Sequence, residues 1–551
     1  MKKRIVIVGG VAGGASAAAR LRRLDEDAEI IMFERGPDIS YANCGLPYYV
    51  GNVINDRYKL LVQTPQGMSR RFGLDVRVLS EVIRINREAK TVEVRDLQSG
   101  NTYTERYDVL ILSPGARPLL PNIPGVTLPS VFTIRNVPDS DRIKQWIEQQ
   151  RPEHVVVVGG GFIGLEMVEN LLEHRVQVSL VEMSAQVMPP LDPEMAALVH
   201  RVLRRQGVEL FLSEQVTELV EIEQVTAVRL ASGKELRADM VIVGAGNQPE
   251  TALAAEAGLA LGATGGIAVD EHLRTSDEAV YAVGDAIEVR SFVGGQPALI
   301  PLAGPANRQG RLVADIICGR EAKYEGTLGT AIAKLFDLVI ANTGMNEKRL
   351  RAAGRKYQVS YTHPAAHATY YPGGVPMAMK LIFDPENGAI LGAQIIGAKG
   401  VDKRIDVLAA AIRKNLTVFD LQELELAYAP PFSSAKDPVN MAGYVAGNII
   451  RGDMAVFHWH EVQDLAAKGG ILVDVRTPAE FREETIPGSI NIPVDVLRER
   501  LSELPADRPL LIFCRVGLRG YLASRILTQH GFKDVKNLSG GWLTYEPAIN
   551  G

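Results

Sequence analysis

Residues 155–164 read VVVVGGGFIG, and this stretch decides the fold of the chain. Val155 to Val158 form a short β-branched run, which is typical of a strand buried on both faces. The glycines that follow match G-x-G-x-x-G, and they predict a helix to about His174. The next expected strand, 178–182, ends on an acid. Such a unit binds a dinucleotide, because its glycines let the backbone approach a pyrophosphate and its acid accepts from a ribose hydroxyl. The residues expected to hold this dinucleotide are Gly159, Gly161, Phe162, Ile163, Gly164 and Glu182.

A second copy of the unit stands at the N-terminus. Ile5 to Val8 is the expected strand, a helix is expected to Arg23, and a second strand closes on Glu34. One residue departs from the pattern, because Val11 stands where the second glycine is usual. Two fingerprints, each followed by an acid after about 20 residues, are a strong signal. The residues expected to hold this second dinucleotide are Gly9, Gly10, Ala12, Gly13, Gly14, Glu34 and Arg35.

Glu182 also predicts which nicotinamide nucleotide is used. A carboxylate at this position accepts from the 2′-hydroxyl of NAD and repels the 2′-phosphate of NADP. The next residue is Met183, and no Arg or Lys stands nearby to pair with a phosphate. We therefore expect NADH to be preferred over NADPH.

The bulk composition is that of an ordinary globular protein. The chain has a net charge of −5 and 46% hydrophobic residues. Its length of 551 residues is too great for one core, so three or four domains are expected. No long run of one charge suggests nucleic acid or a membrane surface as partner. No stretch approaches the roughly 18 continuous apolar residues of a membrane span. The three cysteines form no disulfide framework, which favours a reducing compartment such as the cytoplasm.

One of these cysteines lies in residues 40–49, SYANCGLPYY, a few residues beyond Glu34. Near a flavin, Cys44 would be the point where electrons leave the cofactor for sulfur. The alternative is a small buried apolar residue, which describes most free cysteines. Cys44 alone does not decide between them, because reactivity depends on the environment of the thiolate.

With these motifs the chain resembles the FAD-dependent pyridine nucleotide-disulfide reductase family. Residues 109–118 and 241–249 look like the family's paired crossings between domains, the first with Gly115. Residues 275–286 look like its second FAD motif, with Gly284 and Asp285 at the flavin nucleotide. The resemblance implies FAD and NADH as cofactors, and a homodimer.

Within this family, the single cysteine points to one subgroup. Most members carry two cysteines five residues apart, but Ile39 and Tyr49 stand at the positions either side of Cys44. Cys44 must therefore cycle with an external thiol or as a sulfenic acid. NADH oxidases and peroxidases, which use the sulfenic acid, have a histidine where this chain has Ala12. The motif around Cys44 resembles that of coenzyme A-disulfide reductases, which use coenzyme A as the external thiol.

The same resemblance implies a set of coenzyme A contacts. Arg20 and Arg23 lie one helical turn apart, and guanidinium groups suit phosphates, although most such arginines are simply solvated. Arg70 is a further candidate. The implied substrate-binding residues are Ser16, Arg20, Arg23, Ser40, Asn43, Arg71, Asn307 and Lys436.

Two tyrosines are implied at the catalytic cysteine of the other subunit. They come from residues 365–373, which carry Tyr370 and Tyr371, and residues 425–440, which carry Tyr428. Their hydroxyls could donate to a thiolate leaving group. Spacing favours Tyr370 over Tyr371. Taken alone, each tyrosine would more often be a half-buried packing residue.

A separate unit is expected after about residue 454. The expected strand 510–513 runs into Cys514, and residues 514–519 then wrap towards a helix beginning near Gly520. Successive backbone N–H groups in such a loop form an anion nest, which stabilises a thiolate or persulfide. This region resembles rhodanese sulfurtransferases, whose loop is also six residues long. The resemblance makes Cys514 and Arg519 catalytic. Asp474 and Arg476 match the rhodanese strand motif, whereas Cys318 is expected to be inert.

The expected fold class is α/β, with two Rossmann-like domains, an α+β dimerisation domain and a rhodanese-like α/β domain. The expected boundaries are 1–112 with 241–325 for FAD, 113–240 for NAD, 326–447 for dimerisation, 448–456 for a linker and 457–551 for the rhodanese domain. The expected activity is NADH-dependent reduction of coenzyme A disulfide, coenzyme A persulfide and polysulfides. The alternatives are an NADH oxidase or peroxidase, and a sulfur-carrier or redox-sensing interaction protein.

Overall fold

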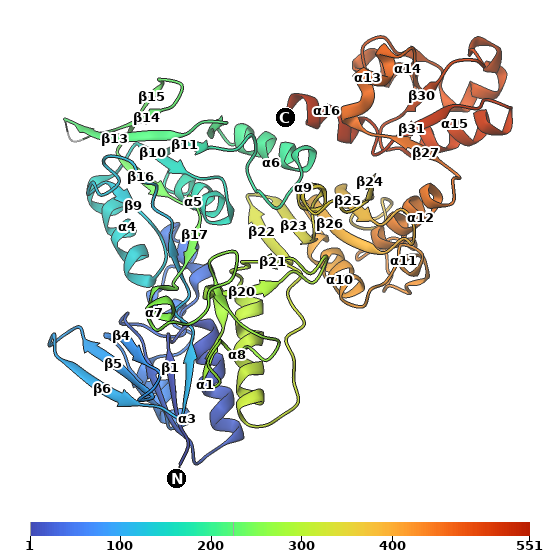
Figure 1. The fold of residues 1–551 in the computed structure, drawn as a ribbon. Coiled ribbons are helices and arrows are strands. Elements are labelled where there is room, and N and C mark those ends of the chain that lie inside the picture. Colours follow the sequence, from blue (N-terminus) through green and yellow to red (C-terminus); the bar gives the residue numbers. More distant parts are fainter. Residues whose placement is uncertain (1, 224) are drawn as a thin grey trace. The chain divides into compact units, whose positions relative to one another are not determined.

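The computed structural model describes residues 2–223 and 225–551, which form two compact units. The first unit comprises the residues up to 185 together with 207–329, and the second comprises 186–206 together with 330–551 (Figure 1).

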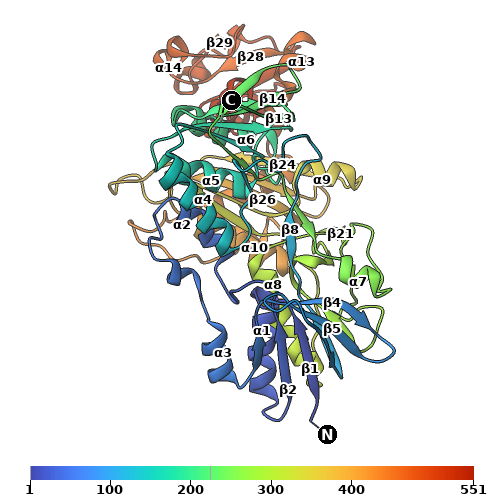
Figure 2. The ribbon, with the colours of Figure 1, turned by 90° about the vertical axis from the view of Figure 1, so that its left-hand side faces the viewer.

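The N-terminal sheet of the first unit is a parallel Rossmann sheet. Its strand order is β19 (Val280–Ala282), β7 (Val109–Leu112), β1 (Arg4–Val8), β2 (Glu29–Phe33) and β3 (Asp75–Arg77). Helices α1 (Ala12–Leu24) and α8 (Ala303–Ile317) run side by side in Figures 1 and 2. Gly310 of α8 permits this approach, because a Cβ atom added there would lie 2.2 Å from the Gly13 carbonyl oxygen in α1.

The second Rossmann sheet repeats this plan. Its order is β12 (Glu209–Leu212), β11 (Gln177–Glu182), β10 (His154–Val158), β16 (Met240–Val243) and β9 (Val131–Phe132), again all parallel. Helix α5 (Phe162–Leu172) follows its glycine turn, and α4 (Val137–Gln150) precedes β10.

The first unit also contains two three-stranded antiparallel meanders. A two-stranded antiparallel sheet is formed by the segments that cross between the domains. The meanders are β4 (Ser80–Asn86), β5 (Thr91–Asp96) and β6 (Thr102–Arg106), and β13 (Val216–Ile222), β14 (Val225–Leu230) and β15 (Glu235–Ala238). The two-stranded sheet pairs β8 (Ala116–Pro118) with β17 (Asn247–Pro249), as expected of the two crossing segments. The predicted pair of Rossmann folds is thus confirmed.

The two glycine turns share one packing constraint. A Cβ atom added at Gly14 would lie 1.9 Å from the carbonyl oxygen of Gly9, and one added at Gly164 would lie 1.9 Å from that of Gly159. These glycines are therefore required by the approach of helix to strand within the protein.

The second unit contains a five-stranded antiparallel sheet, where the sequence predicts a dimerisation domain. The order is β22 (Ala331–Leu335), β23 (Leu338–Gly344), β26 (Ile390–Gly397), β25 (Met377–Phe383) and β24 (Gln358–Thr362). Every residue of β25 and β26 is buried, as expected of central strands covered on both faces. Helices α9 (Glu347–Ala352), α10 (Val401–Arg413) and α12 (Pro438–Ile450) belong to this part.

A buried ionic cluster joins α6 (Pro193–Arg205) to this sheet. The Lys380 ammonium lies 2.8 Å from Asp192 and 2.5 Å from both Glu194 and Glu347, and its side chain is fully buried. Burial disfavours the charged lysine, but the surrounding carboxylates outweigh burial and raise the pKa of Lys380 well above its usual value. Each charge therefore depends on the others, since removing one partner leaves an uncompensated buried ion.

The C-terminal part of the second unit is a parallel sheet. Its order is β27 (Ala455–Phe457), β31 (Val535–Leu538), β30 (Leu510–Phe513), β28 (Ile471–Asp474) and β29 (Ile490–Asn491). Helices α14 (Pro478–Glu483), α15 (Leu518–Gln529) and α16 (Trp542–Asn550) belong to it. The helix expected near Gly520 begins at Leu518, because Gly517 in the left-handed region is its N-cap.

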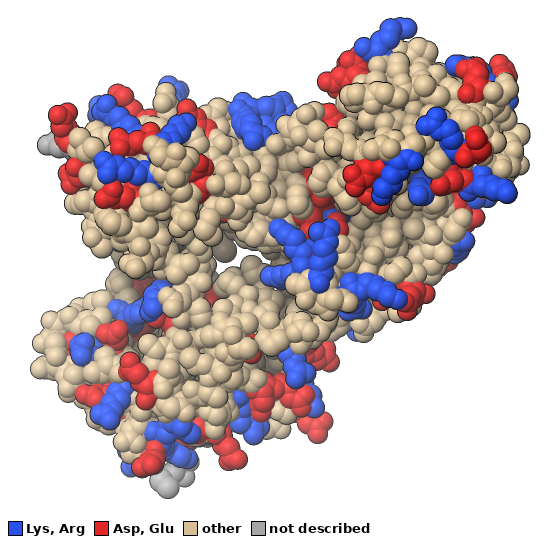
Figure 3. All heavy atoms as spheres, turned by 45° about the horizontal axis from the view of Figure 1, so that its top comes forward, with Lys and Arg blue, Asp and Glu red and all other residues tan. Residues whose placement is uncertain are grey.

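The surface agrees with the modest net charge. Basic and acidic side chains are interspersed over the face in Figure 3, without a broad field of one sign. Within the described residues, no helix is long and apolar enough to span a membrane.

Candidate active site

The first glycine turn lies beside a cavity of about 360 Å³. The carboxylate of Glu34 accepts from the backbone N–H of Gly10 at 2.9 Å and of Gly36 at 2.8 Å. The Arg35 guanidinium lies 2.9 Å from Glu250 across the lining. The lining also includes Val8, Gly9, Phe33, Ser80, Glu81, Val82, Ile83, Arg95, Pro114, Ala252, Leu253 and Glu256. A glycine turn, an acid and an open cavity together fit the adenosine end of FAD.

The second glycine turn has the same polar frame. Glu182 is buried, and its carboxylate accepts from the N–H of Gly160 and of Ser184, both at 2.7 Å. A Cβ added at Gly161 would meet no atom within 4 Å, so this turn leaves space for a ligand backbone to approach. Phe162 and Ile163 open α5 there. These residues fit a second dinucleotide.

Cys44 lies in a single 3₁₀ turn, Asn43–Gly45, immediately before α2 (Leu46–Val50). It is exposed and unpaired. Although part of the residue is exposed, desolvation of its thiol group by the surrounding protein raises the pKa of Cys44; the nearby carboxylates of Glu166 and Asp285 raise it further, whereas Arg135 opposes them. The protein alone therefore favours the thiol, and a reaction must create the thiolate.

Arg135 is a site residue that the sequence did not reveal. Its guanidinium lies 3.6 Å from the Asp285 carboxylate, and its carbonyl accepts from the Asn43 amide at 3.3 Å. Burial raises the pKa of Asp285, and Arg135 opposes this shift. Asp285 follows Gly284 in a 3₁₀ turn, so Arg135 connects this turn to the cysteine segment. No motif marks Arg135, because it precedes an ordinary helix cap at Asn136.

Glu166 was also missed. It lies in α5, and burial together with the neighbouring Glu169 raises the pKa of Glu166 to about 7. Tyr48 shares this environment, because burial and the same two acids raise the pKa of Tyr48 to about 12. A sequence signal did exist, since two acids one turn apart interrupt an otherwise apolar helix.

The expected coenzyme A contacts in the first unit fall into two groups. The Ser16 hydroxyl donates to the Asn307 side chain at 2.5 Å, so the structure brings these two residues together. The Arg20 guanidinium has a partner that the sequence did not indicate, because it donates to the Asp315 carboxylate at 2.7 and 2.9 Å. The remaining predicted residues are Arg23 and Arg71, both exposed, and Ser40, whose φ is +45°.

The structure brings Tyr370 and Tyr428 together. Their hydroxyl oxygens lie 2.6 Å apart, and 73% and 47% of the two residues is exposed. Tyr371 instead places its ring 5.7 Å from that of His367. Lys436 is exposed near the end of the second tyrosine segment.

Arg404 holds the two tyrosine segments to each other. It is 1% exposed, and its guanidinium donates to the Asp437 carboxylate at 2.9 Å, to the Ser433 hydroxyl at 3.1 Å and to the Ala366 carbonyl at 3.1 Å. Asp437 in turn caps α12. The buried guanidinium of Arg404 therefore fixes the two segments that carry the exposed tyrosines.

The Cys514 loop has the expected form. Its sulfur accepts from the backbone N–H of Gly517 at 3.1 Å, at the start of α15. The Arg519 guanidinium makes two bonds of 2.7 Å to Glu480, and this pairing lowers the pKa of Glu480 to about 2. Arg476 and Asp474 form a buried pair at 2.7 Å. A sulfur atom that accepts from a backbone N–H at a helix start can be held as an anion.

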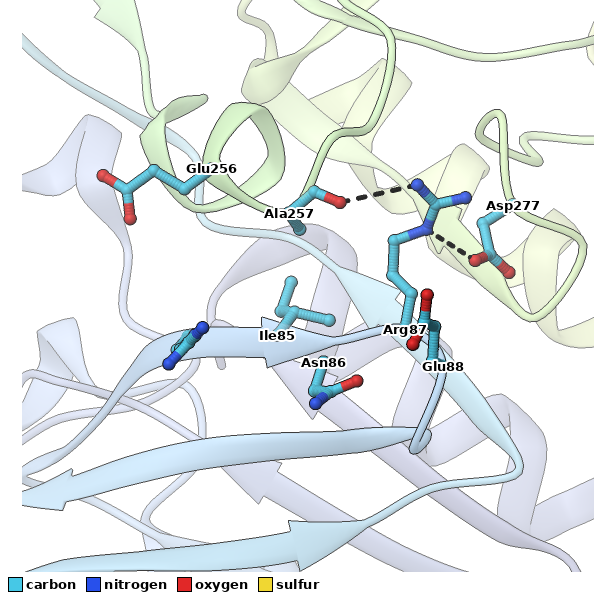
Figure 4. Close-up of a pocket in the computed structure, with 8 residues that line it drawn as sticks. Ile85, Asn86, Arg87, Glu88, Glu256, Ala257 and Asp277 are labelled. Carbon is cyan, nitrogen blue, oxygen red and sulfur yellow. Dashed lines mark hydrogen bonds and ion pairs between the residues drawn. The ribbon is translucent and has the colours of Figure 1, made fainter.

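Two further features carry no chemistry. Cys318 ends α8, and burial raises the pKa of its thiol, which agrees with an inert residue. A larger cavity, of about 490 Å³, is lined by Arg84, Ile85, Asn86, Arg87, Glu88, Glu256, Ala257 and Asp277. Figure 4 shows the Arg87 guanidinium bound to Asp277, at 2.7 Å, and to the Ala257 carbonyl. Arg87 therefore serves the fold there.

Comparison with known proteins adds three domain matches. Residues 3–310 match the pyridine nucleotide-disulphide oxidoreductase family, 330–438 match the dimerisation domain of that family, and 458–547 match the rhodanese-like domain. The resemblance predicted from the motifs is thus confirmed.

Individual relatives cover most or all of the chain. The coenzyme A disulfide reductase of Staphylococcus aureus (strain JH9) is 38% identical over 80% of this chain and 99% of its own. The structure of reduced CoADR-RHD from Bacillus anthracis is 55% identical with a TM-score of 0.98, covering 100% of this chain and 98% of its own. That of an NAD-dependent persulfide reductase from A. fulgidus is 38% identical with a TM-score of 0.93, covering 98% and 100%.

Proposed function

The chain belongs to the pyridine nucleotide-disulphide oxidoreductase family, and from this premise we propose an NADH-dependent flavoprotein that reduces coenzyme A disulfide and coenzyme A persulfide through Cys44. The observation that carries this function is that Cys44 is exposed and lacks any cysteine partner among the described residues. An external thiol must therefore complete its redox cycle. The relatives named for coenzyme A disulfide and persulfide reduction point to coenzyme A as that thiol.

An oxidase is less well supported. A water-forming NADH oxidase from Lactobacillus brevis is similar in fold, with a TM-score of 0.78 over 82% of this chain and 99% of its own, but only 27% identical. In addition, Ala12 stands where the sulfenic-acid enzymes carry histidine. The pure sulfur-carrier alternative leaves two intact dinucleotide sites without a use.

The overall reaction is NADH + H⁺ + CoA–S–S–CoA → NAD⁺ + 2 CoA–SH. FAD, when bound, supplies the relay that takes two electrons from NADH and delivers them to sulfur. Glu34 and the first glycine turn would hold FAD, and Glu182 and the second would hold NADH. Coenzyme A persulfide would follow the same course and yield one coenzyme A and one hydrogen sulfide.

Cys44 provides the sulfur chemistry in this proposal. At rest it forms a mixed disulfide with coenzyme A, and two electrons cleave that bond into the Cys44 thiolate and coenzyme A thiolate. The Cys44 thiolate then attacks one sulfur of an incoming coenzyme A disulfide. The new bond restores the mixed disulfide, and the other coenzyme A leaves as a thiolate that takes up a proton. With a persulfide, attack at the carbon-bound sulfur expels hydrosulfide instead.

Tyr370 and Tyr428 would assist the leaving thiolate. The pair is exposed, and the matched dimerisation domain supports a homodimer in which each subunit's pair serves the other's Cys44. The hydrogen bond that it shares with Tyr428 raises the pKa of Tyr370, so a protonated donor is present at neutral pH. Ser16, Arg20, Arg23, Ser40, Asn43, Arg71, Asn307 and Lys436 remain candidates for binding coenzyme A, although Arg20 also pairs with Asp315.

Cys514 would carry sulfane sulfur. Its thiolate attacks the outer sulfur of a persulfide R–S–SH, which forms Cys514–S–SH and releases R–S⁻. A coenzyme A thiolate then takes that sulfur and becomes coenzyme A persulfide, the substrate of the Cys44 site. Because both sites lie on one chain, the local concentration of this intermediate is raised. We therefore propose persulfide as the preferred substrate, and a cytoplasmic setting in which thiols stay reduced.

Steady-state NADH oxidation with each substrate tests this function. We expect a higher kcat/KM for coenzyme A persulfide than for coenzyme A disulfide. Cys44→Ser should abolish both reactions while FAD stays bound, Cys514→Ser should spare disulfide reduction, and the matched control Cys318→Ser should change neither. Anaerobic mass spectrometry should find coenzyme A on Cys44. Unchanged turnover in Cys44→Ser would remove Cys44 from the mechanism.

A further inference from the structure

The segment 539–546, which joins β31 to α16, contacts both the Cys514 loop and residues outside the C-terminal sheet. On one side it forms backbone hydrogen bonds with the Cys514 loop. The N–H of Trp542 donates to the Cys514 carbonyl at 2.8 Å, and the N–H of Leu543 donates to the Arg515 carbonyl at 3.0 Å. These bonds fix the first two peptide groups of the loop. The direction of the Gly517 N–H towards the sulfur depends on those peptides.

On its other side, the segment is bonded to β24 and to the residue that follows β24. The Ser539 hydroxyl accepts from the Tyr361 backbone N–H at 3.2 Å, and the Thr544 hydroxyl lies 2.8 Å from Nε2 of His363. Burial lowers the pKa of His363 to about 4, so this contact is between neutral groups at physiological pH. Thr544 is 6% exposed. These contacts are therefore shielded from competing water.

A third contact reaches α6. Both carboxylate oxygens of Glu546 lie within 2.7 Å of one Arg201 nitrogen. The hydroxyl of Tyr361 also donates to Glu194 of α6 at 3.0 Å, within the ionic cluster around Lys380. The segment is thus bonded to Tyr361, which itself bonds the buried ionic cluster, and to Arg201 of α6.

We propose that segment 539–546 positions the Cys514 loop, and that Arg201 and His363 are positioning residues for sulfur transfer at Cys514. Neither residue lies within the rhodanese match, 458–547. They act by holding Glu546 and Thr544, and through them the peptide groups that surround the sulfur. This inference rests on the proposed function only in assigning sulfur transfer to Cys514. Small displacements of donors around a reacting anion are known to change its stabilisation strongly.

The test uses the full-length flavoprotein and the variants Thr544→Val and Arg201→Ala. The first readout is the pH profile of Cys514 alkylation by iodoacetamide, followed on the Cys514 peptide by mass spectrometry. The second is the rate at which Cys514 gains one sulfur from glutathione persulfide. We expect alkylation to shift to higher pH and sulfur uptake to slow by about 3- to 10-fold, the effect of losing one hydrogen bond at a site.

Two designs guard against unfolding as the cause. Arg201→Lys should restore part of the rate, and Arg201→Glu combined with Glu546→Arg should restore more than either change alone. The matched control is Arg525→Ala. Arg525 lies within the rhodanese match and also bonds a residue outside it, the Asp453 carbonyl at 2.8 Å, but this bond does not involve segment 539–546. NADH-dependent reduction of coenzyme A disulfide should stay at the parent rate in every variant.

Each result has one meaning. A parental alkylation profile and parental sulfur uptake in both Thr544→Val and Arg201→Ala would overturn the inference. Equal slowing in Arg525→Ala would overturn it too, since any loosening would then suffice. If the parent protein takes up no sulfur on Cys514, the proposed function fails at that site, and the alkylation profile still decides whether the segment positions the thiol.

Discussion

The hydroxyl oxygens of Tyr370 and Tyr428 lie 2.6 Å apart, although 58 residues separate them in the chain. Both side chains are exposed, so the pair is not part of a core. In such a pair one hydroxyl donates to the other, and the second keeps a proton that can be offered outwards. Two hydroxyls joined this way act as one donor.

If the pair acts as one donor, Tyr370→Phe and Tyr428→Phe should each lower kcat/KM for coenzyme A disulfide by about 10- to 100-fold, the usual range for losing acid assistance at one position. The double variant should be little worse than either single one, because groups that act as a unit are not additive. Steady-state kinetics of NADH oxidation measure this. Tyr371→Phe is the matched control and should keep the parent rate. A Tyr371→Phe defect equal to that of Tyr370→Phe would contradict the assignment.

Arg404 should matter for stability. Arg404→Met leaves the buried Asp437 carboxylate without its main partner, and we expect a loss of about 3–5 kcal/mol in the free energy of unfolding. Chemical denaturation measures it. Lys403→Met is the matched control, because Lys403 lies 3.6 Å from the same carboxylate but is more exposed, and it should cost less than about 1 kcal/mol. Equal losses would show that the buried bonds of Arg404 are not special.

Glu182 should determine the choice of nicotinamide nucleotide. Glu182→Ser combined with Met183→Arg removes the carboxylate and adds a cation at a residue that is 70% exposed. We expect the ratio of kcat/KM for NADH to that for NADPH to fall by about 100-fold, since both changes favour a 2′-phosphate. The kcat at saturating NADH should change little. A parent enzyme that already prefers NADPH would refute the assignment.

Glu166 should give the enzyme a pH-dependent stability. Burial raises its pKa to about 7 in the folded state, above an ordinary value near 4.5, so the folded protein holds an extra proton between these values. Stability therefore falls as pH rises through this window, by up to about 2 kcal/mol after allowing for partial exposure. In Glu166→Gln this fall should disappear, and Cys44 should alkylate faster at pH 7, because Glu166 raises the pKa of Cys44. Thermal unfolding from pH 5 to 8 and iodoacetamide kinetics measure both effects. An unchanged pH dependence in the variant would assign the effect to other groups.

Much of the fold could be predicted from local pattern. The two glycine turns, the apolar strands that precede them and the acids that follow were all readable, because a Rossmann unit needs particular residues at fixed spacing. The Cys514 loop was readable for the same reason. The start of α15 was placed two residues late, since the capping role of Gly517 depends on a backbone angle that the sequence does not display.

The partners of charged residues could not be predicted. Arg20 pairs with Asp315, which lies 295 residues away in the chain, and no local pattern indicates this partner. Arg135, Glu166 and Arg404 were missed because each gains its role from segments that meet only in the folded chain. The meeting of Tyr370 with Tyr428 depends on Arg404 in the same way. Local sequence patterns locate motifs, whereas ion pairs depend on which residues come close together in the folded chain.

The close approach at the glycine turns has a consequence for inherited or engineered defects. At Gly14 and Gly164 an added methyl group would strike a carbonyl of the same turn, so the lesion would be in the folding of the domain. At Gly161 the added group would meet no atom within 4 Å, so we expect the domain to fold and, if the turn holds NADH as proposed, the lesion to be in nucleotide affinity. Excess nucleotide can compensate for weak binding by mass action, but it cannot repair a helix that no longer fits its strand. Rescue by added nucleotide would therefore separate the two kinds of glycine variant.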